Sequence, residues 1–353
     1  MKLGAAIVMQ NPQRRQADHD VWWDEIALAD LVEPLGFDSL WSVEHHFTDY
    51  MLIPDVLQLL TFMAARTSRV MLGTAVKVLP WQDPVRVAEQ VACLDVLSRG
   101  RVILGVGRGS GRIEFEGLRV PMAESRDRFK ECAEILLAAL SQERFSYAGR
   151  YYQIPELSVR PRPYSDLTDR IYGAAVSPES AELMAQLGFG CLIIPQRDWD
   201  STALELERSQ AVHRRLGREP KPPVTLSWVY VGESEDEARA SALEYMGEYW
   251  RSSDVHYELS KGAHKDVKTY EFYQQTGDIV ARAGQATVVD NFIAHQVVGT
   301  AQQCIDKMRF IVDKVKTDHM VSVFRYGGMP LPMAERSMRR FADQVMPALR
   351  SPR

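Results

Sequence analysis

Cysteine is scarce in this sequence and forms no recognisable pattern. The four cysteines, Cys93, Cys132, Cys191 and Cys304, lie far apart and make neither a CxxC pair nor a His/Cys cluster with zinc-like spacing. A disulfide framework is therefore not expected, and a reduced compartment, the cytoplasm, fits best.

The sequence also lacks an excess of basic residues and lacks long apolar runs. The formal net charge of −5 leaves no surplus for phosphate backbones or an anionic membrane surface. No stretch approaches the roughly 18 apolar residues of a membrane-spanning helix. The N-terminal apolar run, about seven residues long, predicts a first strand and not a signal peptide. We expect neither nucleic acid nor membrane as a partner.

Common catalytic signatures are also missing. The eight histidines include no HxxxH or Glu-x-x-His spacing, and there is no GxSxG elbow, so metal-dependent and serine-dependent hydrolysis have no support. The glycine-rich run Gly105–Ser110 departs from GxGxxG at its sixth position. We predict no metal site and no nicotinamide-binding fingerprint.

What the sequence does have is an alternation of short apolar runs with longer helical patterns, which is typical of βα units around a parallel sheet. We predict eight strands, over Lys2–Met9, Ser39–Val43, Val70–Val78, Arg101–Val106, Ile171–Ala175, Cys191–Ile194, Val224–Val231 and Met320–Phe324. Helices are predicted over Trp22–Leu35, Val56–Ala65, Pro84–Leu97, Ala123–Leu140, Pro178–Gln186, Ser201–Leu216, Glu235–Arg251, Ala301–Lys316 and Ala334–Met346.

Capping signals support these boundaries. Asp83 precedes a proline at a helix start. Gly36, Gly100 and Gly188 each follow a helix, where a left-handed residue belongs, and lead into a strand. This rhythm belongs to a (β/α)8 barrel or an open doubly wound sheet, and one barrel could absorb the whole chain.

We therefore predict the α/β class, with a single TIM-barrel domain over residues 1–353. The stretch Ser252–Val298, after the seventh strand unit, breaks the alternation. Long insertions in compact domains are usually functional, so we expect this one to cover a barrel mouth as a lid.

Glu44, His45 and His46 follow the second predicted strand. In a barrel the C-terminal strand ends face the active site, so at least one of these side chains should line it. Histidine suits proton transfer near neutral pH. An equally good explanation is that the three side chains satisfy one another at the start of a loop.

Two further segments could hold a ligand. Small residues around Ala75 and Val76 would let a flat ligand approach the backbone, although ordinary inward packing is the commoner explanation. Arg108 lies in the glycine-rich turn and Ser177 at a helix N-terminus, and both arrangements bind anions. Ser177 alone is also a plain N-cap, but together with Arg108 it favours a phosphate.

Several stretches together resemble the bacterial luciferase-like flavin-dependent monooxygenase family, including the luciferase catalytic subunit. They are Glu44–Thr48, Gly73–Pro80, Pro84–Glu89, Leu94–Arg101, Gly262–Asp266 and Val298–Asp306. The resemblance covers nearly the whole chain. It implies the TIM-barrel fold, a cytoplasmic homodimer, and reduced FMN as the cofactor.

The resemblance also implies roles for single residues. His45 corresponds to the active-site histidine that assists the flavin peroxide chemistry. Arg108, Ser177 and Ser180 correspond to positions that hold the flavin phosphate, with Val176 beside them. The Ala75–Val76 bond falls where the family often has a cis peptide against the flavin ring.

Two positions depart from the luciferase catalytic subunit. Gly107 stands where that subunit has a cysteine, and Val176 where it has an acidic residue. Neither change removes flavin binding, but together they argue against light emission and against a long-chain aldehyde substrate.

The resemblance thus implies a two-component monooxygenase. A separate NAD(P)H-flavin reductase would supply reduced FMN, and O2 would give a C4a-hydroperoxyflavin that oxygenates a small, apolar organic substrate. His45 would act as acid, base or hydrogen-bond donor, with Glu44 or His46 orienting it. The alternatives are a deazaflavin-dependent oxidoreductase on the same barrel and a non-catalytic flavin-binding subunit.

Overall fold

The computed structural model describes residues 1–174, 178–195, 197–262, 270, 277–278, 282 and 284–350. Eight parallel strands of this part form a closed ring, with β12 pairing back onto β1. In ring order they are β1 (Lys2–Ile7), β2 (Ser39–Ser42), β3 (Met71–Thr74), β5 (Val102–Gly107), β8 (Ile171–Ala174), β9 (Gly190–Ile193), β10 (Val224–Val231) and β12 (His319–Val323). The predicted TIM barrel is confirmed.

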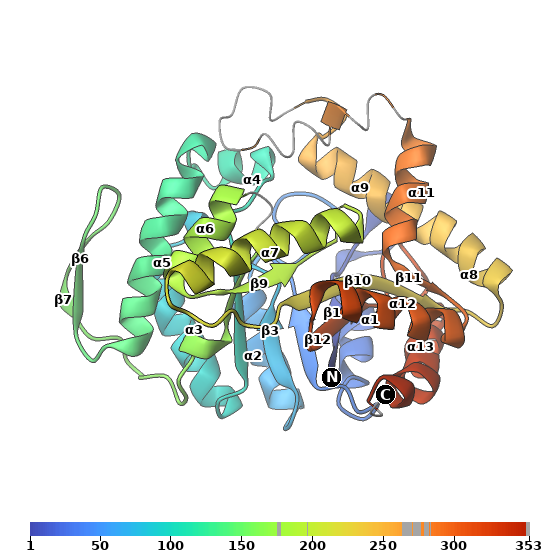
Figure 1. Ribbon diagram of the computed structural model, residues 1–353, viewed down its shortest axis with the longest axis horizontal. Helices are drawn as coiled ribbons and strands as arrows, with labels where there is room; N and C mark the ends of the chain where they lie inside the picture. Colours follow the sequence, from blue (N-terminus) through green and yellow to red (C-terminus); the bar gives the residue numbers. More distant parts are fainter. Residues whose placement is uncertain are drawn as a thin grey trace.

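Helices surround the ring (Figure 1). They are α1 (Asp18–Asp30), α2 (Val56–Arg66), α3 (Pro84–Ser98), α4 (Arg112–Gly117), α5 (Ser125–Ser141), α6 (Pro178–Leu187), α7 (Trp199–Arg215), α8 (Glu235–Ser241), α9 (Gly247–Tyr257), α11 (Gln285–His295), α12 (Ala301–Val315), α13 (Leu331–Arg340) and α14 (Met346–Arg350). One π-helical turn, Ala242–Met246, joins α8 to α9. No helix among the described residues combines the length and apolarity needed to cross a membrane.

The strands run as nearly continuous apolar sequences because both of their faces are covered. All six residues of β5 and all eight of β10 are buried, as expected for parallel strands between an interior and a helical layer. Asp83 accepts hydrogen bonds from the first free amides of α3 at 2.9 Å, and Gly100 follows that helix with φ +83°. The predicted caps of α3 are therefore present.

Trp41 on β2 fills part of the barrel interior. A Cβ added to Gly73 on the neighbouring β3 would lie 2.2 Å from the Trp41 ring. The Trp41 indole donates to Ser39 Oγ at 2.8 Å, and that oxygen lies 2.7 Å from His319 Nε2 on β12. Gly73 is thus explained by inward packing and not by the approach of a flat ligand.

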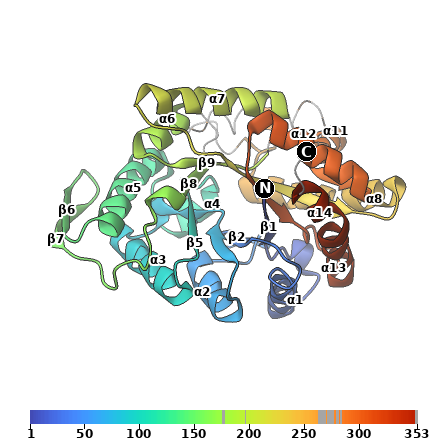
Figure 2. The ribbon, with the colours of Figure 1, turned by 60° about the horizontal axis from the view of Figure 1, so that its bottom comes forward.

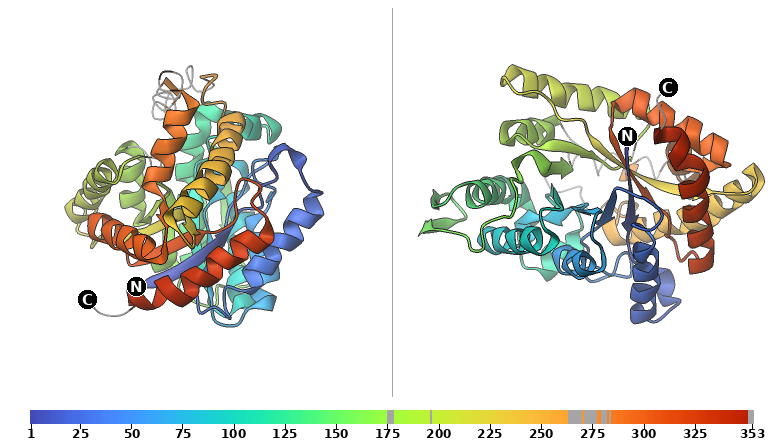
Figure 3. Two further views of the ribbon diagram at one scale, coloured as in Figure 1. Left: turned by 90° about the vertical axis from the view of Figure 1, so that its right-hand side faces the viewer. Right: turned by 90° about the horizontal axis from the view of Figure 1, so that it is seen from below.

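The two ends of the barrel differ in what covers them. The start of β1 lies at the bottom of Figure 1, so the C-terminal ends of the parallel strands face the top, where α4, α9 and α11 lie. At the opposite end the last helix lies beside the first strand (Figures 2 and 3), and Arg350 of α14 contacts Asp38 at 2.8 Å. The top is therefore the end where a barrel active site is expected.

Some elements were not predicted. An antiparallel hairpin of β6 (Phe145–Ala148) and β7 (Gln153–Leu157) projects away from the barrel (Figures 1 and 2). The predicted insertion Ser252–Val298 is helical at both ends, since α9 runs to Tyr257 and α11 ends at His295. The strand β11 (Val297–Gly299) then pairs with β10. Residues 263–269, 271–276, 279–281 and 283 lie outside the described residues, and the lid remains a prediction.

Candidate active site

A cavity opens at the C-terminal ends of the strands. Its space, including that at its open mouth, is about 1680 Å³. Predicted site residues from four separate segments line it, namely Glu44, His45, Ala75, Val76, Arg108 and Ser180. Side chains that were not predicted also line it, and they include Glu114, Arg126 and Tyr257. The fold therefore brings most of the predicted site residues to one place.

His45 is held firmly in the lining of the cavity. Its backbone amide donates to the carbonyl of Ile53 at 3.0 Å. The ring Nδ1 lies 3.0 Å from Glu114 Oε1, and Nε2 lies 3.5 Å from the hydroxyl of Tyr257. With Nδ1 engaged by a carboxylate, the Nε2 edge is the one available for proton transfer.

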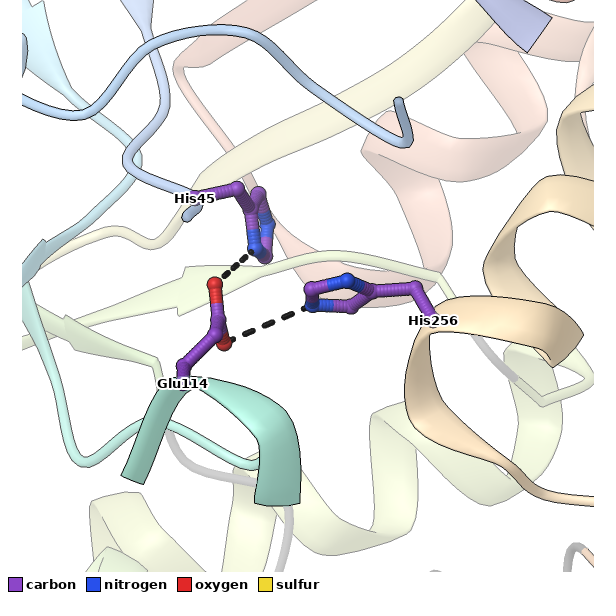
Figure 4. Close-up of side chains that lie close together, drawn as sticks. All are labelled: His45, Glu114 and His256. Atoms are coloured by element: carbon purple, nitrogen blue, oxygen red, sulfur yellow. Dashed lines mark hydrogen bonds and ion pairs between the residues drawn. The ribbon is translucent and has the colours of Figure 1, made fainter. Parts of the chain in front are cut away.

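Glu114, on α4, has its carboxylate between two imidazoles (Figure 4). One oxygen also accepts the His46 amide at 2.9 Å, and the other lies 3.4 Å from His256 Nε2. Burial raises the pKa of this carboxyl, but the charge of His45 and the hydrogen bonding of both imidazoles outweigh burial and lower the pKa to about 2. Glu114 is therefore an anion throughout the neutral range.

His256, on α9, is fully buried. Its Nδ1 lies 2.7 Å from Thr48 Oγ1, and its ring stacks on Tyr50 with centroids 4.9 Å apart. Burial lowers the pKa of His256, against the raising effect of Glu114 and with further lowering by His45. The imidazole is therefore neutral near pH 7.

His45, Glu114 and His256 each offer one ligand atom, and these atoms lie within 4.8 Å of one another. Such a set of two histidines and a carboxylate could hold a metal ion, which the local spacings in the sequence did not indicate. The contact of His45 with Glu114 is already a hydrogen bond. Protons can therefore hold the three groups together without an ion.

Glu44 and His46 have other partners. The buried Glu44 carboxylate accepts Lys77 Nζ at 2.9 Å and the amide of Val78 at 2.8 Å, and His46 Nε2 lies 3.5 Å from it. The ring of His45 is in contact with Glu114, which was not predicted for this role; the orienting role of Glu44 or His46 remains a prediction. Direct catalytic roles for Glu44 and His46 remain predictions.

The cavity lining also contains a set of hydrogen-bond donors. Arg108, Arg126, Ser110 and Ser180 line it. The guanidinium of Arg108 lies over the ring of Tyr270, 4.0 Å from its centroid. Guanidinium and hydroxyl groups suit a phosphate. The other predicted phosphate residues, Val176 and Ser177, lie outside the described residues, so their roles remain predictions.

Other residues of the cavity lining are apolar. Ala75, Val76 and Phe129 line it, together with Trp81. The Ala75–Val76 peptide bond is cis, as the family resemblance implied. A planar ring system with an anionic tail matches a lining that combines apolar residues, guanidinium groups and an imidazole, so the residues present fit FMN.

A family model described as luciferase-like monooxygenase matches residues 1–315. The chain belongs to that family of oxidoreductases. Among its relatives, the alkanal monooxygenase alpha chain of Photorhabdus luminescens is 26% identical, covering 99% of this chain and 97% of its own. The oxygenase component of flavin-dependent trigonelline monooxygenase from Acinetobacter baylyi is 23% identical, covering 99% and 95%.

Solved structures show the same fold. Monooxygenase RslO1 of Streptomyces bottropensis superposes with a TM-score of 0.83 at 25% identity, covering 99% of this chain and 100% of its own. The oxygenating constituent of 3,6-diketocamphane monooxygenase from Pseudomonas putida, in complex with FMN, gives 0.76 at 18% identity over 98% of both chains. An F420-dependent secondary alcohol dehydrogenase gives 0.73 at 17% identity over 99% of both.

Proposed function

We propose that this protein is the oxygenase component of a two-component monooxygenase that takes reduced FMN from a separate NAD(P)H-flavin reductase. The observation that carries this proposal is one cavity lined both by the guanidinium groups of Arg108 and Arg126 and by an imidazole held by a buried carboxylate. Family membership and the FMN-bound and oxygenase-component relatives support it. The substrate would be a small, apolar organic molecule, and the active form a cytoplasmic homodimer.

Arg108, Arg126 and Ser180 would hold the FMN phosphate, joined by Ser177, with the ring system against Ala75 and Val76. Reduced FMN, when bound, would supply the electrons that activate O2. The apolar wall would keep bulk water away from the reacting groups.

His45 would move the proton that the reaction requires. Ionised Glu114 accepts Nδ1–H of His45, which leaves the Nε2 lone pair facing the cavity beside Tyr257. In this state Nε2 can take a proton, and the neighbouring anion stabilises the resulting imidazolium. A neutral side chain that donates a hydrogen bond in place of Glu114 would neither accept Nδ1–H nor stabilise the imidazolium.

Oxygen uptake tests the function directly. The purified protein, a flavin reductase, NAD(P)H and FMN would be offered a panel of carbonyl compounds, sulfonates and terpenes, with product formation measured beside O2 consumption. We expect product to form with FMN and with at least one substrate class. Absence of product across the panel, or tight binding of the deazaflavin with none of FMN, would reject the proposal.

Replacing Arg108 by alanine should weaken FMN binding by roughly ten- to a hundredfold, because a charge-assisted contact to phosphate is lost. Riboflavin, which lacks the phosphate, is the matched control and should bind the variant and the original protein equally. Titration of flavin fluorescence measures both ligands. Equal losses for FMN and riboflavin would contradict the assignment of Arg108 to the phosphate.

A further inference from the structure

Glu114 and His256 meet in a buried contact between a hydrogen-bond acceptor, Oε2, and a ring nitrogen that can donate, Nε2. Among the described residues, Glu114 Oε2 and His256 Nε2 make no hydrogen bond within strict limits, yet they face each other at 3.4 Å. Their side chains are 1% and 0% exposed. Leaving two such atoms unpaired is costly, and active-site hydrogen bonds that are long without ligands often shorten when the site is filled.

The proton positions follow from the neighbouring groups. The amide of Tyr50 donates to Thr48 Oγ1 at 3.4 Å, and the Thr48 hydroxyl can donate in turn to His256 Nδ1 at 2.7 Å. The neutral imidazole then carries its proton on Nε2, directed at Glu114. The opposite tautomer would set the Nε2 lone pair against the carboxylate anion, which is repulsive.

The sequence leaves room for this contact at Gly111. A Cβ added there would lie 2.4 Å from Glu114 Oε2 and 2.9 Å from His256 Nε2. Gly111 has φ −76°, so backbone conformation does not require a glycine. Space for the carboxylate and the imidazole is the physical reason for the missing side chain.

A second contact joins α4, which carries Glu114, to the end of α9, which carries His256. Arg112, at the start of α4, contacts Glu258, just past the end of α9, at 2.6 Å. His256 is also confined by its stack on Tyr50, whose hydroxyl lies 3.0 Å from that of Tyr249. The imidazole therefore has a fixed orientation relative to Glu114.

We propose that His256 is a positioning residue. It holds the Glu114 carboxylate through Oε2, the oxygen that does not contact His45, so that Glu114 fixes the orientation and tautomer of His45. The inference rests on the proposed function, because it gives His45 its task. Three groups, from the loop after β2, from α4 and from α9, would then act as one unit, with Nδ1–H of His45 and Nε2–H of His256 donated to the two oxygens of one carboxylate.

Two substitutions separate this role from a structural one. His256→Gln keeps an amide donor near the place of Nε2, whereas His256→Phe keeps a planar ring on Tyr50 but has no donor. We expect turnover to fall at least tenfold in His256→Phe and to stay within about threefold in His256→Gln, with FMN affinity unchanged in both. Gly111→Ala should resemble His256→Phe. Equal losses in His256→Phe and His256→Gln would overturn the proposal.

Nitrogen NMR of histidine-labelled protein without flavin gives a reading that does not depend on the reaction. We expect the neutral His45 ring to carry its proton on Nδ1 in the original protein and in His256→Gln, and to be a mixture of tautomers in His256→Phe. An unchanged His45 signal in His256→Phe would reject the positioning role even if the oxygenase activity is confirmed. Stoichiometric metal that is required for activity would also reject it, because the cluster would then be a metal site.

Discussion

Alanine in place of His45 should lower the rate of substrate oxygenation by roughly a hundred- to ten-thousandfold, which is the usual range for removing a positioned acid or base. FMN affinity should change little, since the phosphate is assigned to Arg108 and Arg126, which line the same cavity, and not to His45. Electrons from reduced FMN should then be lost to hydrogen peroxide. Product formation, peroxide release and FMN binding, measured on the same preparation, test all three points.

His19 offers a matched control, because its side chain is 77% exposed. Its replacement by alanine should leave every one of these quantities unchanged. If the His45 variant kept its full rate of substrate oxygenation, the proton would have to come from another group.

Lys77→Met should destabilise the protein by about 3–5 kcal/mol, because removing one member of a buried ion pair leaves an uncompensated charge. The Lys77 side chain is 1% exposed, and that of Glu44 is 0% exposed. Methionine has nearly the same length as lysine without its charge, so packing is largely preserved. Urea unfolding followed by circular dichroism measures the change in the free energy of unfolding.

The double variant Lys77→Met with Glu44→Gln should recover much of that loss, since no buried charge remains. Arg144→Met breaks a solvent-exposed pair with Glu156 and should show no measurable change. A loss in Lys77→Met that is no greater than that in Arg144→Met would show that the Glu44 carboxylate finds other compensation, for example from His46.

Most of the barrel could be predicted because its strands consist largely of apolar residues, which indicates that they are buried. Val102–Gly107 is apolar over its length and Val224–Val231 is mostly apolar, and glycines such as Gly100 mark the turns between helix and strand. The hairpin Phe145–Leu157 lacks this signal, since most of its residues are half-buried or exposed. The three-residue β11 is too short for any periodic pattern.

Only part of the candidate active site could be predicted from the sequence, because some of its residues do not follow a strand end. His45 follows a strand end, and strand ends point to the cavity in any barrel. Glu114 and His256 have no such mark, because the first is 69 residues from His45 and the second comes from α9. The contact of Glu44 with Lys77 could not be predicted, because Lys77 lies 33 residues further along the chain and a local motif does not show it.

Ring closure makes the two ends of the polypeptide depend on each other during synthesis. The edge of β1 that faces β12 pairs from Lys2–Ala6 to His319–Val323. Until the ribosome has released that last strand, the first one has only β2 as a neighbour and presents a row of unsatisfied amides and carbonyls. Newly made chains therefore pass through a long period with an open edge, during which chaperones or wrong pairing partners compete for it.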